Sequence, residues 1–376
     1  MKRRFVLSIC LVALVLVPII VWLGQRNGTS SQTPKFTFAA ILPLTGPLAD
    51  LGENEKKGIE LALDQLRKAG INQIAFSFHD SAGKPPVALS AVRQQYDLKG
   101  QRFFVLATTG PVLATLPALQ QEKDSKVLIA QTMYPSVTTG FPFAARLFPS
   151  SDEEATLLAT QANRQGAQRI AILHVNNEWG AESIKVFTKS LVHPNSIVAR
   201  EQFAIPDKDF RSQIERIKTV NPDCLLVYAY PASFPSIVKQ TIDSGLLVPI
   251  LANSDFALAS ISSAFPEDHL KRVTFTAPKF YISNDSKPMK EFIEAAKASG
   301  FEPNFDIASF HDMTMIMNKA ASLAPDRTPS GFLRGLEDAL PYDGLIGRME
   351  WSKDRDVVVH LTLVQWKDGK MARITN

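Results

Sequence analysis

Short apolar runs alternate with segments of helical periodicity from Lys35 onward, and this alternation limits the possible fold more than any other feature of the sequence. In the helix expected at Glu53–Lys68, apolar residues recur every three or four positions and share one face. Strands that alternate with helices are typical of parallel sheets covered by helices on both faces, with right-handed crossovers. The expected strands are Lys35–Pro43, Ile74–Phe78, Phe103–Ala107, Val127–Ala130, Ile170–His174, Ile197–Phe203, Cys224–Tyr228, Val248–Leu251 and Val273–Thr276.

The net positive charge of the chain comes from its N-terminal segment. Of the 41 Lys and Arg residues, four precede Lys35, so that 37 remain to balance the 37 Asp and Glu residues, none of which precedes Lys35. A neutral body argues against nucleic acid as a partner, because that binding depends on clustered positive charge. The length of 376 residues predicts about two domains.

The first 34 residues predict export from the cytoplasm. Lys2, Arg3 and Arg4 precede the apolar stretch Phe5–Leu23, which as a helix would span about 28 Å, close to the thickness of membrane hydrocarbon. This length favours an uncleaved anchor, while small residues around Gly28 leave a cleaved signal peptide as the alternative. The positive charges hold the N-terminus in the cytoplasm, so in either case the body lies outside the cytoplasmic membrane.

Sequence signatures of catalysis and of cofactor binding are missing. No two glycines lie two positions apart, which excludes a dinucleotide fingerprint, and the chain has neither a phosphate-binding Gly-x-x-x-x-Gly-Lys loop nor a Gly-x-Ser-x-Gly nucleophile elbow. The six histidines are scattered, with no pair at metal-ligand spacing. We therefore expect no enzyme, no metal and no cofactor. In parallel sheets, ligands bind beyond the carboxyl ends of the strands, so the loops there are the candidate sites.

Two successive loops at strand ends offer hydroxyl groups. Thr108 and Thr109 follow the expected strand Phe103–Ala107 and precede a helical run, while Gln131 and Thr132 follow the next strand. Hydroxyls and backbone N–H groups at a helix N-terminus suit a carboxylate. The alternative for Thr109 is that it only caps the helix.

Aromatic and acidic residues follow the later strands. Trp179 and Tyr230 each come soon after an expected strand, where an aromatic ring can pack over a ligand, although a role in the core is the alternative. Asp255 follows the strand Val248–Leu251, and its carboxylate could pair with an ammonium group. Ordinary turn chemistry explains Ser254 and Asp255 equally well.

Together these segments resemble the type I periplasmic binding proteins, and within them the group that binds leucine, isoleucine and valine. The likeness extends from Phe36 to the C-terminus, and it rests on the order and spacing of several motifs. These are Ile41–Gly52 leading into Lys57–Ala62, Asp80, Thr108–Pro117, Arg169–Ile172 leading to Trp179 and Gly180, Asp209 and Phe210, Gly347–Trp351, and Asp368–Lys370.

The resemblance implies an α/β fold of two doubly wound parallel-sheet lobes joined by three crossovers, here preceded by one N-terminal apolar helix. We expect residues 1–34 to form the signal peptide or membrane anchor with a tether. Residues 35–148 and 280–350 are expected to form the first lobe, and residues 149–279 and 351–376 the second. The first passage between lobes is expected near Phe148–Ser150.

The resemblance also implies a ligand site between the lobes. In that family a hydroxyl residue binds the ligand carboxylate, aromatic residues line the pocket, and an acid pairs with the ligand ammonium. Leu51 replaces a common aromatic, Pro111 lacks an N–H, and Ser254 rather than Asp255 occupies the acid position unless the register shifts by one. The ligand-binding residues carried over by position are Thr108, Thr109, Gln131, Thr132, Trp179, Tyr230, Asp255 and Phe305.

The expected function is that of an extracytoplasmic solute-binding protein, a monomer that captures an amino acid or related small polar solute and delivers it to an ABC permease. It would act in the periplasm or at the outer face of the cytoplasmic membrane. The alternative is a membrane-tethered sensing module for amino acids, amides or small carboxylates, which a retained anchor would suit. An α/β enzyme, such as a hydrolase, is a third possibility that rests on fold analogy alone.

Overall fold

The computed structural model describes residues 33–257, 265–282 and 285–374. Lys35–Asn376 forms one compact unit, distinct from Met1–Pro34. The apolar segment Phe5–Leu23, predicted to be an anchor or a signal peptide, lies outside the described residues. Among the helices that the structure describes, none is long and apolar enough to cross a membrane.

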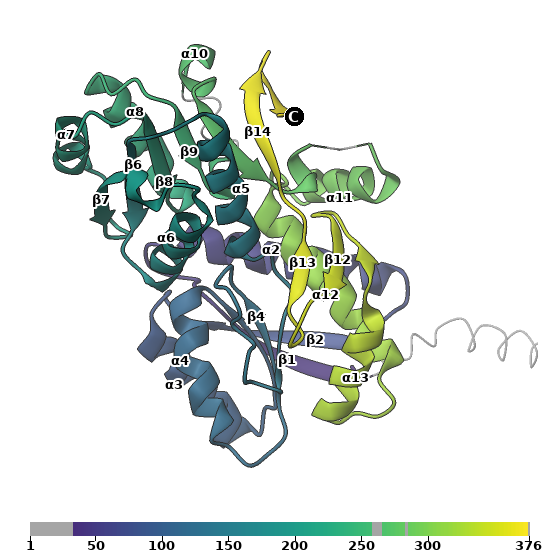
Figure 1. The fold of residues 1–376 in the computed structure, drawn as a ribbon. Coiled ribbons are helices and arrows are strands. Elements are labelled where there is room, and N and C mark those ends of the chain that lie inside the picture. Colours follow the sequence, from purple (N-terminus) through teal and green to yellow (C-terminus); the bar gives the residue numbers. More distant parts are fainter. Residues whose placement is uncertain (1–32, 258–264, 283–284, 375–376) are drawn as a thin grey trace, which may run out of the picture. The chain divides into compact units, whose positions relative to one another are not determined.

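A five-stranded parallel sheet forms the centre of the first lobe (Figure 1). The sequence of strand β1 shows why both of its faces are buried, because apolar residues fill every position from Phe38 to Leu42. Phe38 and Ala40 pack into the core on one face, and Ala39 and Ile41 pack into the core on the other. In spatial order the strands are β2 (Ile74–Asp80), β1 (Phe36–Leu42), β3 (Phe103–Ala107), β4 (Val127–Gln131) and β5 (Ala144–Arg146).

Helices cover both faces of this sheet. One face packs against α2 (Ala49–Lys68), α11 (Lys287–Ala298), α12 (Phe305–Leu323) and α13 (Pro329–Ala339). The other face packs against α3 (Pro85–Arg93), the π-helical turn η1 (Gln94–Leu98) and α4 (Thr109–Gln120). The first lobe is therefore doubly wound, as the alternation of strands and helices predicts.

A seven-stranded sheet forms the centre of the second lobe, and its edge departs from the expected parallel arrangement. Strand β10 pairs in parallel with β9 but antiparallel with β14, which in turn pairs antiparallel with β15. In spatial order the strands are β15 (Lys370–Arg373), β14 (Thr362–Lys367), β10 (Val273–Ala277), β9 (Ile250–Ala252), β8 (Cys224–Tyr228), β6 (Ile170–Val175) and β7 (Ile197–Phe203).

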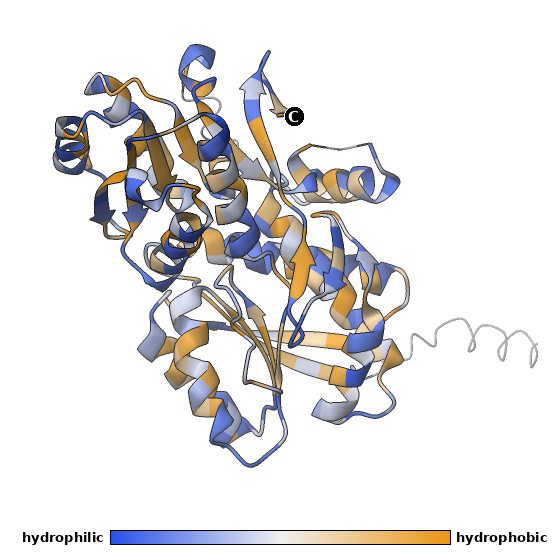
Figure 2. Ribbon diagram, viewed as in Figure 1, coloured by the Kyte–Doolittle hydropathy of each residue, from blue (hydrophilic) through white to orange (hydrophobic). Residues whose placement is uncertain are grey.

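Four longer helices and several short ones surround this second sheet. Figure 2 shows mostly hydrophobic strands and helices of mixed hydropathy, the pattern of a sheet buried between amphipathic layers. The longer helices are α5 (Ser151–Arg164), α6 (Glu178–Ser190), α7 (Arg211–Thr219) and α8 (Phe234–Asp243). The short ones are α10 (Glu267–Leu270), η2 (Pro194–Ser196), η3 (Pro231–Ser233) and η4 (Ser254–Ala257), whereas η5 (Lys279–Tyr281) contributes Phe280 to the core of the first lobe.

The chain changes core three times. It passes to the second lobe between β5 and α5, returns between β10 and η5, and passes again between a small third sheet and β14. That sheet consists of β11 (Tyr342–Asp343), β12 (Arg348–Trp351) and β13 (Val357–Val359). Because Val357 and Val359 still pack in the core of the first lobe, the last passage follows β13 instead of residue 350, where the sequence placed it.

A buried ion pair connects the first and last of these passages. The Arg146 side chain, 2% exposed, pairs with Asp356, and its Nη1 donates to the carbonyl of Tyr134 at 2.8 Å. The backbone N–H of Arg146 donates to the carbonyl of Arg355 at 2.9 Å. The segment of the first passage between the lobes and the segment of the last passage are therefore held side by side.

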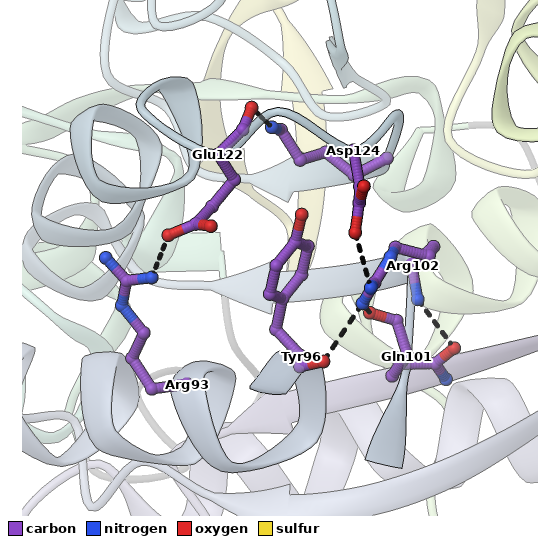
Figure 3. A network of polar contacts seen from close by, with 7 residues as sticks. Arg93, Tyr96, Gln101, Arg102, Glu122 and Asp124 are labelled. Carbon is purple, nitrogen blue, oxygen red and sulfur yellow. Dashed lines mark hydrogen bonds and ion pairs between the residues drawn. The ribbon is translucent and has the colours of Figure 1, made fainter. Parts of the chain in front are cut away.

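A second polar network holds α3, η1 and β3 to the end of α4 (Figure 3). Arg102 donates to Asp124 at 2.7 Å and to the carbonyl of Tyr96 at 2.9 Å, while Arg93 at the end of α3 pairs with Glu122. The residues that line the cavity described below are different ones, so this network supports the lobe and does not contribute to the site.

Candidate functional site

A cavity is lined by residues from both lobes. Seven of the eight sequence-predicted ligand residues lie on its wall, where the carboxyl ends of several strands meet. The lining residues are Leu51, Glu55, Thr108, Thr109, Gln131, Thr132, Met133, Phe148, Trp179, Tyr230, Asp255 and Asp306.

Thr108 lies between β3 and α4 in a strained backbone conformation. Its φ of 69° and ψ of 147° define a region that glycine occupies readily and a residue with a Cβ occupies at a cost. Thr108 is the N-cap residue of α4, yet no side chain makes a cap hydrogen bond there, and its Oγ1 has no partner although it is buried. The start of α4 therefore presents N–H groups without a side-chain acceptor.

The alternative interpretation of Thr109 was that it only caps the helix, but Thr109 is not the cap residue of α4. It is the first residue of α4, and its hydroxyl lies 2.7 Å from the hydroxyl of Thr132. Thr132 Oγ1 also accepts a hydrogen bond from the N–H of Tyr134 at 3.1 Å. The two hydroxyl loops that the sequence singled out thus meet directly at the ends of β3 and β4.

Gln131 ends β4 beside these hydroxyls and is only 3% exposed. Neither its Nε2 nor its Oε1 has a hydrogen-bond partner. Leaving a buried amide unpaired costs free energy, so this side chain is ready to donate to a ligand and to accept from it.

Two aromatic side chains from the second lobe form another part of the wall. The rings of Trp179, near the start of α6, and Tyr230, before η3, lie 5.1 Å apart between centroids. The Tyr230 hydroxyl accepts from Asn177 Nδ2 at 3.2 Å, whereas the buried Nε1 of Trp179 has no partner. Asn177 itself caps α6 by accepting from the N–H of Gly180 at 2.8 Å. The rings thus offer an apolar surface with one unused donor.

Asp255, in η4, is the acid from the second lobe that reaches the cavity. Its neighbour Ser254 is buried, and the Ser254 N–H donates to the Glu154 carboxylate at 2.7 Å. Glu154 also accepts from Thr276 Oγ1 at 2.7 Å, which connects η4 to α5 and β10. Burial raises the pKa of Asp255 well above its usual value, and the Asp306 and Glu154 charges raise it further.

Two cavity carboxyl groups, Glu55 and Asp306, were missed by the reasoning from sequence. Glu55 lies in α2 and is 3% exposed, and Asp306 lies in the first turn of α12 and is 7% exposed. Burial raises the pKa of Asp306 to about 7. Burial, with the Asp306 charge as a smaller contribution, raises the pKa of Glu55 well above its usual value. The one available signal was Gly58, whose missing side chain lets two helices approach closely.

Phe305 is the one predicted residue that does not lie on the cavity wall. It is buried in the core of the first lobe, and its ring centroid lies 5.7 Å from that of Phe148. Because Asn304 caps α12 by accepting from the N–H of Ile307 at 3.0 Å, the helix begins with Phe305, and the next residue, Asp306, reaches the cavity instead.

The arrangement is suited to holding a small molecule. The first lobe contributes hydroxyls, an amide and a helix N-terminus to the wall, and the second lobe contributes aromatic rings. Carboxyl groups come from both lobes. Within the described residues, no group of three or more His, Cys, Asp or Glu side chains is arranged to hold a metal ion.

Comparisons with known proteins point in one direction. A family model described as periplasmic binding protein matches residues 35–370. The Leu/Ile/Val-binding protein homolog 3 of Brucella melitensis is 23% identical over 91% of this chain and 94% of its own length. A leucine-, isoleucine-, valine-, threonine- and alanine-binding protein of Pseudomonas aeruginosa is 26% identical over 86% of this chain and 91% of its own length.

Solved structures share the fold at low sequence identity. The branched-chain amino acid transporter substrate-binding protein of Streptococcus pneumoniae, in complex with isoleucine, has a TM-score of 0.76 at 20% identity and covers 90% of this chain and 98% of its own. A solute-binding protein of an ABC transporter from R. palustris, in complex with 4-hydroxybenzoate, has a TM-score of 0.76 at 19% identity and covers 90% of this chain and 95% of its own.

Proposed function

The chain belongs to the type I periplasmic binding proteins, in the branched-chain amino acid family, and from this premise we propose that it is an extracytoplasmic solute-binding protein of an ABC-type uptake system. It would capture an amino acid or a related small polar solute and deliver it to a permease in the cytoplasmic membrane. The names of its relatives support this role, since they bind branched-chain amino acids or, in one solved structure, a hydroxybenzoate.

The observation that carries the proposal is the cavity to which both lobes contribute. Thr108, Thr109 and Gln131 come from the first lobe, and Trp179 and Asp255 from the second. A solute that contacts both sets of residues binds most strongly when the lobes are closed on it, so binding selects the closed state.

Each part of the wall suits one part of an amino-acid-like solute. A carboxylate fits the hydroxyls of Thr108 and Thr109 and the free N–H groups at the start of α4. An ammonium group fits Asp255, whose carboxyl pKa is raised by burial and by the nearby Asp306 and Glu154 charges. The aliphatic or aromatic remainder fits the rings of Trp179 and Tyr230.

Ligand-dependent thermal stability tests this proposal. A ligand at about 100 times its Kd adds roughly 2.7 kcal/mol to the free energy of unfolding, enough to raise Tm by several degrees. The panel would contain branched-chain, polar and basic amino acids, amides, urea, aliphatic amines and small carboxylates including benzoates. At least one compound is expected to stabilise the protein, and Asp255→Asn or Trp179→Ala should reduce the shift.

The matched control is Asp338→Asn, which replaces an exposed carboxylate on α13 and should leave the ligand-induced shift unchanged. If no compound of the panel raises Tm, the binding-protein proposal is contradicted.

A further inference from the structure

The charges around the cavity are of one sign. Glu55, Asp255 and Asp306 line it, and the described residues that form its wall include no lysine, arginine or histidine. Glu55 and Asp306 come from two helices of the first lobe, while Asp255 comes from the second lobe. A zwitterionic solute with one ammonium group and one carboxylate would add no net positive charge to these three groups.

A second hollow of about 1000 Å³ continues the acidic surface. It shares Leu51, Tyr230 and Asp306 with the first cavity, and it adds the exposed carboxylates of Asp50 and Glu302. Its wall, which also lies within the described part of the chain, contains no basic side chain. The remaining wall is formed mainly by four prolines, Ala232, Leu48 and Leu51, with the neutral amides of Asn54 and Asn304.

The cavity wall contains buried hydrogen-bond acceptors, as well as donors, that have no partner. Glu55 Oε2 is buried and accepts no hydrogen bond, and the Gln131 Oε1 acceptor is likewise unused. Both side chains are 3% exposed. A carboxylate buried without a positive partner is costly, and the alternative to a partner is that it keeps a proton. Burial is the main cause of the raised pKa values of Glu55, Asp255 and Asp306, and a cation paired with these groups would lower them.

A metal ion is not the fitting partner, because the three carboxyl groups do not form a metal-binding cluster among the residues that the structure describes. An organic cation fits better. Ammonium and guanidinium groups donate several hydrogen bonds to carboxylates, and they also pack favourably over aromatic rings such as those of Trp179 and Tyr230.

We propose that the solute carries two cationic nitrogen groups, as a basic amino acid or a diamine does, with one group held between Asp255 and the first-lobe acids and the other extending past Asp306 toward Asp50 and Glu302. This inference rests on the proposed binding function and defines its substrate class. A carboxylate on the solute is compatible with it, because Thr108, Thr109 and the start of α4 remain available for an anion.

Isothermal titration of the full chain with two matched pairs of probes tests the inference. Lysine is compared with norleucine, and 1,5-diaminopentane with pentylamine, in each case at pH 8 and low ionic strength so that charge interactions are not screened. The two members of each pair differ in one cationic group. We expect lysine to bind about 100-fold more tightly than norleucine, or the diamine about 10-fold more tightly than the monoamine.

Variants assign the effect to the acids. Glu55→Gln and Asp306→Asn should each weaken binding of the dication about 10-fold or more while norleucine binding stays within about 3-fold, and far-UV circular dichroism and Tm establish that each variant is folded. Glu53→Gln, on the exposed face of the same helix as Glu55, is the matched control and should leave both affinities unchanged.

Protonation gives an independent readout. Burial raises the pKa values of Glu55 and Asp255 well above their usual values, so a dication that pairs with these carboxyl groups should displace protons, and the binding enthalpy should vary with the ionisation enthalpy of the buffer. Tyr230 and Tyr281 also face these groups, but burial raises their pKa values, so they stay neutral throughout. Proton release with lysine or the diamine that exceeds release with norleucine supports the inference.

The possible outcomes separate this inference from the proposed function. If leucine, norleucine or a benzoate binds as tightly as the dications or more tightly, the inference is wrong and the binding function stands. If neither the dications nor any compound of the wider panel binds, both are wrong.

Discussion

Thr108 and Asp306 each carry a cost in folding free energy that only the cavity explains. The backbone of Thr108 lies in a region where a residue with a Cβ loses about 1–3 kcal/mol. Asp306 is buried, and burial is the cause of its raised pKa. The Thr108 hydroxyl has no hydrogen-bond partner, and both residues line a space where a ligand could provide one.

The pH dependence of stability tests the cost at Asp306. An aspartate in an unfolded chain has a pKa of about 3.9, and burial raises that of Asp306 to about 7. Between these values the folded protein keeps a proton that the unfolded chain has released, so this group lowers stability as the pH rises from about 4 to about 7, and the full cost is present above 7.

Asp306→Asn removes this cost. We expect its free energy of unfolding in urea to exceed that of the parent protein by about 2–4 kcal/mol at pH 8, and the difference to vanish toward pH 4. The surface substitution Asp338→Asn should change stability by less than about 0.5 kcal/mol. A variant that is less stable than the parent at pH 8 would contradict the account of this residue.

Sequence patterns identified the cavity residues near the carboxyl ends of strands and missed the two carboxyl groups within α2 and α12. Thr108, Gln131 and Asp255 lie at or just after strand ends, where the geometry of parallel sheets places ligand-binding groups. Glu55 and Asp306 lie within helices, where a carboxyl group ordinarily faces water, and their burial becomes visible only when α2 packs against α12. The spacing of residues within one helix does not predict such a contact with another helix.

At the level of elements, the packing of α2 against α12 brings the two helical acids to the cavity. Gly58 in α2 makes the close approach possible, because a Cβ there would lie 2.4 Å from the carbonyl oxygen of Ile307 and 2.9 Å from Cβ of Phe310. Glu55 lies one turn before Gly58, and Asp306 directly precedes Ile307. The position of both carboxyl groups therefore depends on this one contact.

Gly58→Ala should separate the two helices. Alanine favours a helix by about 1 kcal/mol over glycine, yet the clash with α12 should outweigh this gain and lower the free energy of unfolding by about 1–3 kcal/mol. Urea denaturation measures the change. Glu53→Ala, at an exposed position of the same helix, should be neutral or slightly stabilising, and a Gly58→Ala variant as stable as that control would contradict the packing argument.

The strand pattern was easier to predict than helix starts or strand directions. Strands β3, β7 and β8 begin and end at the expected residues, and β3 and β8 are short apolar runs between polar segments. Helix α2 begins four residues earlier than expected, at Ala49, since its N-cap residue Leu48 gives no capping signal. The antiparallel strands β14 and β15 were not expected, because the apolar pattern of a strand does not encode its direction.

At the scale of the whole chain, equal numbers of acidic and basic residues in the body hide an uneven distribution of charge. The basic residues lie outside the cavity and the adjoining hollow, whereas five carboxyl groups line them. The two lobes contribute different groups to the cavity wall. The first contributes hydroxyls, an amide and two acids, and the second contributes two aromatic rings and one acid. A solute must therefore contact both lobes to satisfy all of these groups, which makes its capture depend on lobe closure.

Intrinsic fluorescence tests that capture most directly. Of the tryptophans that the structure describes, Trp179 alone lines the cavity, while Trp351 and Trp366 lie in β12 and β14. Titration with the solute that gives the largest thermal stabilisation should change the emission in a saturable way, and Trp179→Phe, which keeps an aromatic ring, should abolish most of the change while the solute still raises Tm. A stabilising solute that leaves the emission unchanged, or a change that persists undiminished in Trp179→Phe, would place binding elsewhere and contradict the account.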